Sequence, residues 1–461
     1  MKQFTWFATI IIIGSLSTFA LAGNPLVDLQ FPSSPNPVGS GSNALGMGGA
    51  FIGIADDATA PSWNPAGLLE LEKPEFSFVL SHINRREKNH WANHPESNSK
   101  DCIHDKNFNY LSFVYPLPKS ISESDIVVAL SYQHLYDFNR TWHFVYNHPD
   151  PIYTDPVTYQ FDQDGSIYAL GMAIAYYAKP HLSIGMTLNY WGDFINENKW
   201  EKQYHQISRI KIPPLPIGIP RYIVMNKSEE FLFRGWNANF GFQYKLISNQ
   251  KKYHFRIAGV LKTGFKADID HMITFETRQT FPEGGGTDTY HVQTYTYQET
   301  MHMPVSYGLG FVYCYDFANN NRLNLATDIY RTNWNHFEIE DSAGLRKSPV
   351  NGQPSSISHI QATTLVRLGA EYIIRDYKMN DHLFTFSLRS GLFYDPAPAD
   401  NSPDDYYGIS CGLGIAYQSI VFDIAYQYRF GNDVGSSMLP EVDYSQDVKE
   451  HTVYTSMVLY F

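Results

Sequence analysis

Gly39–Leu71 reads GSGSNALGMGGAFIGIADDATAPSWNPAGLLEL, and the rest of the chain is organised around this stretch. It holds too many glycines for the interior of a helix or strand, and too many apolar residues for an exposed linker. Aspartate, asparagine and proline within it are typical of turns. A compact plug inside a larger shell would satisfy this pattern. The defining residues are Gly46, Gly48, Gly49, Asp56, Asp57, Asn64, Pro65 and Ala66.

The pattern GxGxxALGMGGAFxxxADDATAxxWNPAGL in this stretch resembles the N-terminal hatch of the FadL/TodX family of outer-membrane transporters for hydrophobic compounds. A glycine-rich loop of a soluble domain is the alternative. A phosphate-binding loop is disfavoured, because no Gly-Lys-Ser/Thr follows the glycines. If the segment is a hatch, we expect Asn64–Ala66 to anchor it and Gly46–Gly53 to pack closely against the inner wall of a barrel.

Residues 1–22 are predicted to be a secretory signal peptide. Lys2 forms the basic start, residues 4–19 form the apolar centre, and Ala20-Leu21-Ala22 is a small-residue cleavage site. A retained membrane anchor is the alternative, but the apolar run is short for a bilayer span. The predicted organisation is a signal peptide (1–22), an N-terminal extension with the hatch (23–73) and a barrel (74–461).

Composition favours a membrane barrel over a helical membrane protein. The chain has 33 Tyr and 30 Phe, yet its mean hydropathy is only −0.30. A barrel combines a lipid face with a polar interior, and its aromatic residues form girdles at both interfaces. The net charge of −12 argues against nucleic acid as a partner. Cys102, Cys314 and Cys411 form no spacing motif, so we expect no disulfide framework.

Strict alternation of large and small residues predicts β-strands towards the end of the chain. In residues 407–417 the large side chains of Tyr407, Ile409 and Leu413 alternate with small ones such as Gly408 and Gly412. A helix would spread these residues around its circumference. A soluble sandwich would also alternate, but its small-residue face would make a poor core. An apolar outer face around a small or polar lumen fits better.

The same alternation predicts an all-β fold: a transmembrane antiparallel barrel of about 14 strands, plugged by the N-terminal hatch. The expected strands are 74–84, 107–116, 124–136, 165–178, 181–194, 231–247, 253–267, 302–316, 321–334, 361–375, 383–395, 406–418, 420–431 and 450–461. The connections between them alternate long and short, which is typical of long extracellular loops and short periplasmic turns. Both the hatch and the C-terminus are therefore predicted to be periplasmic.

Two features near the end of the chain add to the resemblance. Phe461 closes the last expected strand on its lipid-facing parity, and it resembles the signal by which the barrel-assembly machinery recognises outer-membrane barrels. Residues 391–407, GLFYDPAPADNSPDDYY, resemble the short Asp-Pro-rich connection of FadL-type proteins.

Motifs with catalytic or metal-binding character are weak. Gly408–Gly412 is a literal G-x-S-x-G, but Ser410 lies inside an unbroken strand and not at a strand-to-helix turn. His90 and His94 have a spacing that forms a metal pair only on a helix, and they fall in a predicted polar loop. We expect no enzyme activity, no metal and no cofactor.

Two groups of residues are candidates for ligand binding. The loop segment 210–220, IKIPPLPIGIP, exposes Leu215 and Ile217, and the resemblance implies that it helps to form a groove for hydrophobic substrate. Packing against other loops is the alternative. Charged residues are also assigned to the lumen face, where a fatty-acid carboxylate or a hatch-to-wall network would pair with them. They are Arg234, Arg256, Lys262, Lys266, Arg389 and Arg429.

The resemblance implies passive uptake of a hydrophobic small molecule, either a long-chain fatty acid or an aromatic hydrocarbon, through the outer membrane and its lipopolysaccharide. The hatch would shift to release the molecule. Two alternatives belong to other classes. One is a FadL-like scaffold barrel that binds protein partners and transports nothing. The other is a lipid hydrolase that uses Ser410.

Overall fold

A computed structural model describes residues 40–118, 125–148, 152–211, 220–247, 252–284, 286–439 and 443–461. The short helices α2 (Ser42–Gly46), α3 (Ala60–Trp63) and η1 (Pro65–Glu70) come first. Further 3-10 turns follow at η2 (Pro95–Ser97), η3 (Trp334–His336) and η4 (Ser436–Met438). No helix among the described residues has the length and apolar character that a membrane span requires.

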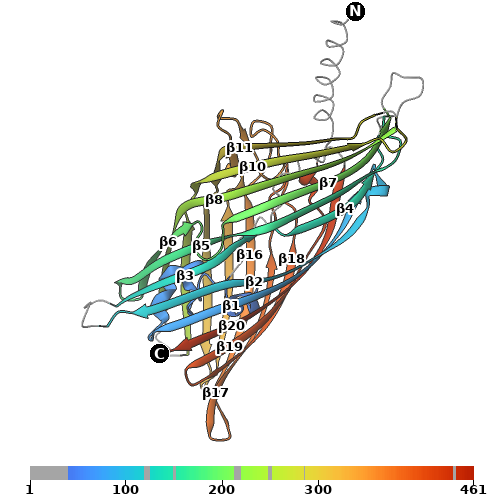
Figure 1. The fold of residues 1–461 in the computed structure, drawn as a ribbon. Helices are drawn as coiled ribbons and strands as arrows, with labels where there is room; N and C mark the ends of the chain where they lie inside the picture. The colour runs from blue at the N-terminus through green and yellow to red at the C-terminus, as the bar shows by residue number, and fades with distance from the viewer. Residues whose placement is uncertain are drawn as a thin grey trace, which may run out of the picture.

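All other elements are strands of one antiparallel sheet (Figure 1). The first ten are β1 (Glu75–Trp91), β2 (Ser99–Pro116), β3 (Ile126–Asp137), β4 (Arg140–Tyr146), β5 (Val157–Lys179), β6 (Leu182–Trp191), β7 (Lys199–Lys211), β8 (Pro220–Ile247), β9 (Tyr253–Lys262) and β10 (Phe265–Thr280). The others are β11 (Thr289–Met303), β12 (Ser306–Asp316), β13 (Arg322–Thr332), β14 (Glu338–Glu340), β15 (Arg346–Lys347), β16 (Thr363–Met379), β17 (His382–Tyr394), β18 (Tyr407–Tyr417), β19 (Ile420–Val434) and β20 (Tyr444–Tyr460).

The sheet closes on itself, because β1 pairs with both β2 and β20. Several pairs of labelled strands are two halves of one interrupted strand. β9 and β10 both pair with β8, and β11 and β12 run opposite them. With such halves joined, the described residues form a closed antiparallel barrel of 14 strands, so the predicted fold class is confirmed.

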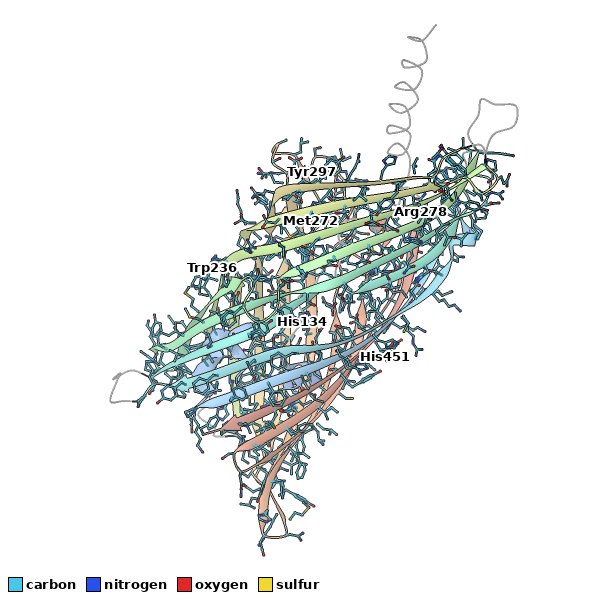
Figure 2. All side chains as sticks on the ribbon, in the orientation of Figure 1. His134, Trp236, Met272, Arg278, Tyr297 and His451 are labelled. Carbon is cyan, nitrogen blue, oxygen red and sulfur yellow. The ribbon has the colours of Figure 1, made fainter. Side chains whose placement is uncertain are left out.

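The outer face carries the large apolar side chains. In β18, Ile409 and Leu413 are exposed while Ser410 and Gly412 are buried, as the alternation predicts. Trp236 projects outward from β8 in Figure 2. The apolar band continues around the barrel through Phe113, Leu130, Met172, Phe240, Leu261, Leu309, Leu325, Leu368, Leu388 and Ile424. Such a band is typical of a surface in contact with lipid.

The long connections were wrongly predicted as loops. Residues 85–106, 137–164, 195–230 and 268–301 are largely strand, in β1 and β2, β4 and β5, β7 and β8, and β10 and β11. In β4 and β5 the alternation continues but is inverted: buried Trp142, Phe144 and Phe161 face inward, and polar residues face outward. In the outer parts of β10 and β11 both faces are polar or mixed, while the hydrogen-bonded ladder continues. The connections at the opposite end, such as 180–181 and 418–419, are short. We call these two ends of the barrel the loop end and the turn end.

A buried charge cluster lies within the sheet at the loop end. His271 on β10 is 3.8 Å from Glu229 and 3.3 Å from Glu299, and its ring stacks on Phe231 with centroids 4.0 Å apart. Burial lowers the pKa of His271, but the two carboxylates outweigh burial and raise this pKa above its ordinary value. Burial raises the pKa of Glu229, but His271 and Lys227 outweigh it and bring this pKa down to about 2.

This cluster predicts that the β10–β11 hairpin loses stability in alkaline solution. A raised histidine pKa contributes stability below about pH 6.5, the unfolded value, and this contribution disappears as the pH rises through the folded value. Hydrogen exchange of β10 and β11 amides, corrected for intrinsic rates, should show less protection at pH 8.5 than at pH 6. His271→Gln should remove most of that difference. An unchanged pH dependence in His271→Gln would contradict the assignment.

Candidate functional site

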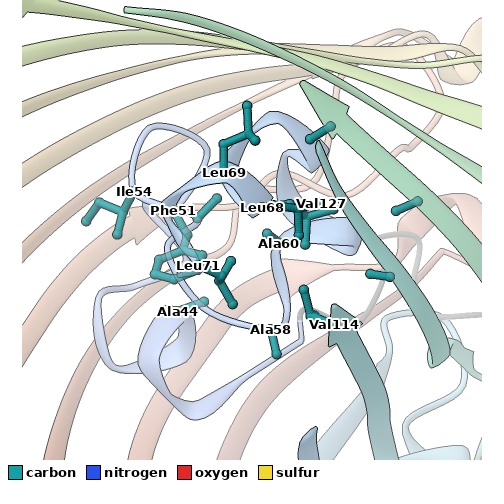
Figure 3. Close-up of a cluster of buried hydrophobic side chains, with 14 of the residues drawn as sticks. Ala44, Phe51, Ile54, Ala58, Ala60, Leu68, Leu69, Leu71, Val114 and Val127 are labelled. Carbon is teal, nitrogen blue, oxygen red and sulfur yellow. The ribbon is translucent and has the colours of Figure 1, made fainter. Parts of the chain in front are cut away.

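Residues 40–71, which we call the hatch segment, lie inside the barrel (Figure 3). Met47, Phe51, Ile54 and Leu68 are buried in a common apolar cluster. Wall residues from β2, β3, β5, β12 and β13 complete this cluster, among them Val114 and Val127. The glycines and small apolar residues of the segment therefore form the core of the barrel interior.

Asn64 joins two turns of the hatch segment to the wall. Its side-chain amide donates to the carbonyl oxygens of Ile52 at 2.9 Å and of Phe242 on β8 at 3.1 Å, and its side-chain oxygen accepts from the amide of Ala66 at 3.1 Å. Pro65 follows as the first residue of η1. The wall has Gly241 at this contact, where a Cβ would come within 1.9 Å of the Asn64 side-chain oxygen. Any larger residue would displace Asn64.

Asp328 on β13 holds the middle of the hatch segment. One of its carboxylate oxygens accepts hydrogen bonds from the amides of Phe51 at 2.6 Å and Ile52 at 2.8 Å. Asp328 is 1% exposed, so these bonds form away from bulk water. Buried polar groups are stable only when they are hydrogen-bonded, and these two bonds therefore hold this part of the segment in position.

At Gly48 the hatch backbone meets the wall backbone. A Cβ on Gly391 of β17 would lie 2.2 Å from the amide nitrogen of Gly48, a distance that real Cβ atoms do not reach. Gly48 itself has φ +66°, which favours glycine. Nearby, the hydroxyl of Ser410 donates to the carbonyl of Gly46 at 2.9 Å. The hydroxyl of the G-x-S-x-G sequence thus forms a hydrogen bond with the backbone of the hatch segment.

Arg389 is neutralised by the wall. Its guanidinium is 2.8 Å from Glu371 and 2.5 Å from Asp423, and all three side chains are almost fully buried. Its aliphatic stem faces Gly46, where an added Cβ would lie 3.3 Å away. The structure therefore places this candidate ligand-binding residue in a network beneath the hatch segment, with both acidic partners supplied by the barrel.

Arg429 and Lys262 also point into the barrel. Arg429 is 3.1 Å from Asp395 and stacks over the ring of Tyr406 at 3.7 Å. Lys262 faces the ring of Tyr330 at 5.9 Å. On a neighbouring part of the wall, Arg256 contacts Glu70 of the hatch segment at 3.8 Å. These cations face the lumen, as their parity indicates.

Arg234 and Lys266 do not face the lumen, and that prediction is wrong. Arg234 is half-exposed on the same parity as Trp236, with Asp193 3.8 Å and Asp270 3.5 Å from its guanidinium. Lys266 is exposed, while Phe265 packs against the inner cluster. The parity rule fails here because the lumen at this level is lined by aromatic side chains, so a large apolar residue no longer marks the lipid face.

Within the described residues, two small cavities lie inside the barrel. A cavity of about 130 Å³ lies between the hatch segment and the wall, lined by Arg85, Arg367 and Arg429 together with Asp105, Asp137, Asp395 and Glu450. A second cavity of about 50 Å³ lies where β9 gives way to β10 and β11 to β12, lined by Lys262, Trp191 and Phe265. Sites for drug-sized ligands typically have about 300–1,000 Å³, so both cavities are too small for a long-chain fatty acid.

Towards the loop end, aromatic residues fill the lumen above the hatch segment. Trp191, Trp200, Phe231 and Phe233 project from the wall into one buried cluster. The connection after β13 adds Trp334, Phe337 and Ile360 to this cluster. These residues form an aromatic layer over the wall of β3, β5, β6, β7, β8, β10 and β11, in addition to the hatch segment.

Several other candidate residues lie in turns or on the surface, and two lie outside the described residues. Asp57 accepts from the amide and hydroxyl of Thr59 and holds a turn, while Asp56 is exposed. His90 lies on β1 and pairs with Asp447 at 3.2 Å, and His94 precedes η2. Leu215 and Ile217 lie outside the described residues. Among the described residues, no group of three or more histidine, cysteine, aspartate or glutamate side chains is arranged to hold a metal ion.

Sequence reasoning missed the strongest contacts of the hatch segment. The carboxylate of Asp328 accepts from hatch amides, and Arg367 donates to the carbonyl of Gly49. Lys245 forms an ion pair with Glu70. Glycines that face it recur on separate wall strands: Gly185, Gly241, Gly310, Gly369, Gly391 and Gly412. Glycine on the lumen parity of several strands was the available signal.

Comparisons with known proteins agree with this geometry. A family model described as BamG matches residues 40–435. Among solved structures, a Pseudomonas aeruginosa FadL homologue aligns with a TM-score of 0.57 at 14% identity, covering 94% of this chain and 99% of its own. The P. putida toluene transporter TodX aligns with a TM-score of 0.53 at 13% identity, covering 92% and 99%. The search of curated proteins found no match. The chain therefore has the fold of the FadL/TodX transporters.

The buried network predicts unequal effects of two arginine substitutions. Arg389→Met should lower the free energy of unfolding by about 3 kcal/mol or more, because it leaves Glu371 and Asp423 buried without a cation. Arg234→Met, the matched control, should cost less than about 1 kcal/mol because its partners are exposed. Urea titration of the folded fraction by gel mobility measures both. Equal losses would contradict the network.

Proposed function

This chain belongs to the BamG family, and from that premise we propose that it is a permanently plugged FadL-like barrel of the outer membrane that works as a scaffold for protein partners. The fold is that of transporters, but the lumen is occupied by the chain's own residues. The family match points to the assembly of outer-membrane barrels as the process in which such a scaffold acts.

The observation that carries this proposal is the way the hatch segment is held. Asn64, Asp328 and Arg367 bind its backbone from inside or from the wall, and wall glycines meet it without intervening side chains. To move, the segment would leave the buried side chain of Asp328 without its two amide donors. A buried polar group left unsatisfied costs about 1–3 kcal/mol. A locked plug suits a scaffold better than a gate.

Transport of a hydrophobic molecule is the second candidate, and the shared fold with a FadL homologue and TodX favours it. A fatty acid would need more room than the cavities provide, and a carboxylate would compete with Asp395, Asp423 and Glu371 for the arginines. A small aromatic hydrocarbon is the better-sized cargo. The larger cavity is lined by charges, however, and apolar ligands favour apolar walls.

The proposed location in the cell follows from the N-terminal sequence and the apolar outer band of the barrel. Residues 1–22 serve as a cleaved signal peptide, and the apolar outer band sits in the outer membrane. The turn end faces the periplasm and the loop end faces the outside, so the extended sheet of the loop end is available to partners at the cell surface. Phe461 remains the proposed recognition signal for insertion.

The scaffold proposal predicts an insulating and cargo-independent protein. The wild-type barrel in planar bilayers should show no ion conductance, and labelled palmitate and toluene should show no saturable binding. Deletion of 39–71 should leave a folded barrel that conducts ions. Saturable uptake of either compound by cells expressing the wild type, lost with the deletion, would favour transport over the scaffold.

A further inference from the structure

The extended sheet at the loop end leaves one of its edges open. Along Thr289–Glu299, β11 pairs with β10 on one side. On the other side β14 pairs only with Thr300–His302. Within the described part of the chain, no strand pairs with the free side of residues 289–299. β11 is the uppermost strand of this wall in Figure 1, and Tyr297 lies on it in Figure 2.

The opposite edge of the same sheet is closed by the chain itself. β4 pairs with β5 on one side. On the other, the hydroxyl of Ser97 donates to the carbonyl of Val145 at 2.6 Å, and the carboxylate of Glu96 accepts from the amide of Asn147 at 3.2 Å. Trp142 packs against Tyr444 in the same region. One edge is thus capped by η2 and its neighbours, and the β11 edge is not.

The sequence of the open edge lacks the usual protection. Exposed edge strands normally carry lysine, proline or a bulge that prevents pairing. Residues 289–299 read TYHVQTYTYQE, without lysine, arginine or proline, and their only carboxylate, Glu299, sits at the base beside His271. Tyrosine, threonine and valine favour strands. Tyr290, Val292, Tyr295 and Tyr297 are all exposed. The register with β10 is unbroken along this edge, and Glu299 is its only carboxylate, so its backbone is competent to pair.

We propose, resting on the scaffold function above, that Thr289–Glu299 of β11 is the docking edge for an extended, uncharged strand of a different protein, which adds to the sheet by main-chain hydrogen bonds. β14 already pairs antiparallel with Thr300–His302, directly next to this edge, and the partner strand continues the line of β14 along Thr289–Glu299. Alternate side chains of the partner pack against the tyrosines on the two faces.

A second copy of this chain does not fit the edge. Two copies in one membrane with the same orientation are related by a rotation about the membrane normal. An antiparallel ladder across a two-fold axis requires strands perpendicular to that axis, and a parallel one requires strands along it. Barrel strands tilt by roughly 35–45°, which meets neither condition. A two-fold pairing of this edge with itself is therefore excluded, and we assign the edge to a strand of another protein.

Photo-crosslinking in intact cells tests this inference. A benzoylphenylalanine placed at Tyr295 or Tyr297 should form adducts with one partner, at sites two residues apart in an extended segment of it. The double variant Thr294→Lys/Thr296→Lys should reduce adducts from Tyr297 by ~10-fold or more, because edge lysines prevent pairing. The control Thr274→Lys/Met272→Lys changes the residues opposite on β10, one strand further in, and should leave the adducts unchanged.

The possible outcomes separate the edge from the scaffold. Adducts with a second copy of this chain, with residues 212–219 of the same chain, or with no protein would overturn the docking edge. If a partner still co-purifies with the Thr294→Lys/Thr296→Lys variant at wild-type yield, the scaffold stands and this edge is not its contact. If no partner co-purifies with the wild type and hydrophobic uptake is saturable, the proposed function itself fails. Heat-modifiable gel mobility confirms folding of every variant.

Discussion

Closure of the ladder between β1 and β20 is the constraint on which the rest of the structure depends. Barrels of about eight strands are filled by their own side chains, whereas wider ones enclose open space. A closed sheet of fourteen strands therefore requires additional material in its lumen if it is not to be a water-filled pore. The hatch segment supplies that material, and the aromatic layer around Trp191 and Trp334 adds to it on one side of the lumen. Because the hatch segment must fit within the barrel, the wall has glycines where the two backbones meet and ion pairs where charged side chains are buried.

The fold was predictable because its two signals are local. The glycine-rich stretch needs no partner to be noticed, and strict alternation in residues such as 407–417 marks a strand whose outer face meets lipid. The loop-end sheet was not predictable by the same rule, because its outward face is polar and its large apolar residues, such as Trp142 and Phe161, face inward. In β10 and β11 both faces are polar or mixed, and only pairing with neighbours makes them strands. The parity error at Arg234 has a related cause: Phe231 and Phe233 face an aromatic lumen and resemble lipid-facing residues.

The site was predictable in part. The residue types of Asn64–Ala66 indicate a turn, and hydrogen bonds from the Asn64 side chain to Ile52 and Phe242 fix the position of that turn. Asp328 could not be selected from sequence. A single aspartate in an alternating strand gives no sign that it accepts hydrogen bonds from two distant amides. Arg389 could be placed in the lumen, but its neutralisation by Glu371 and Asp423 depends on the registers of four neighbouring strands, β16 to β19.

Hydrogen exchange of the Phe51 and Ile52 amides tests the central claim, that the hatch segment is locked, most directly. In wild-type protein reconstituted in lipid nanodiscs, these amides should exchange as slowly as those of the central barrel strands, and added palmitate or toluene should not accelerate them. Exchange at loop-like rates, or acceleration by either compound, would contradict a locked plug and identify the segment as a moving gate.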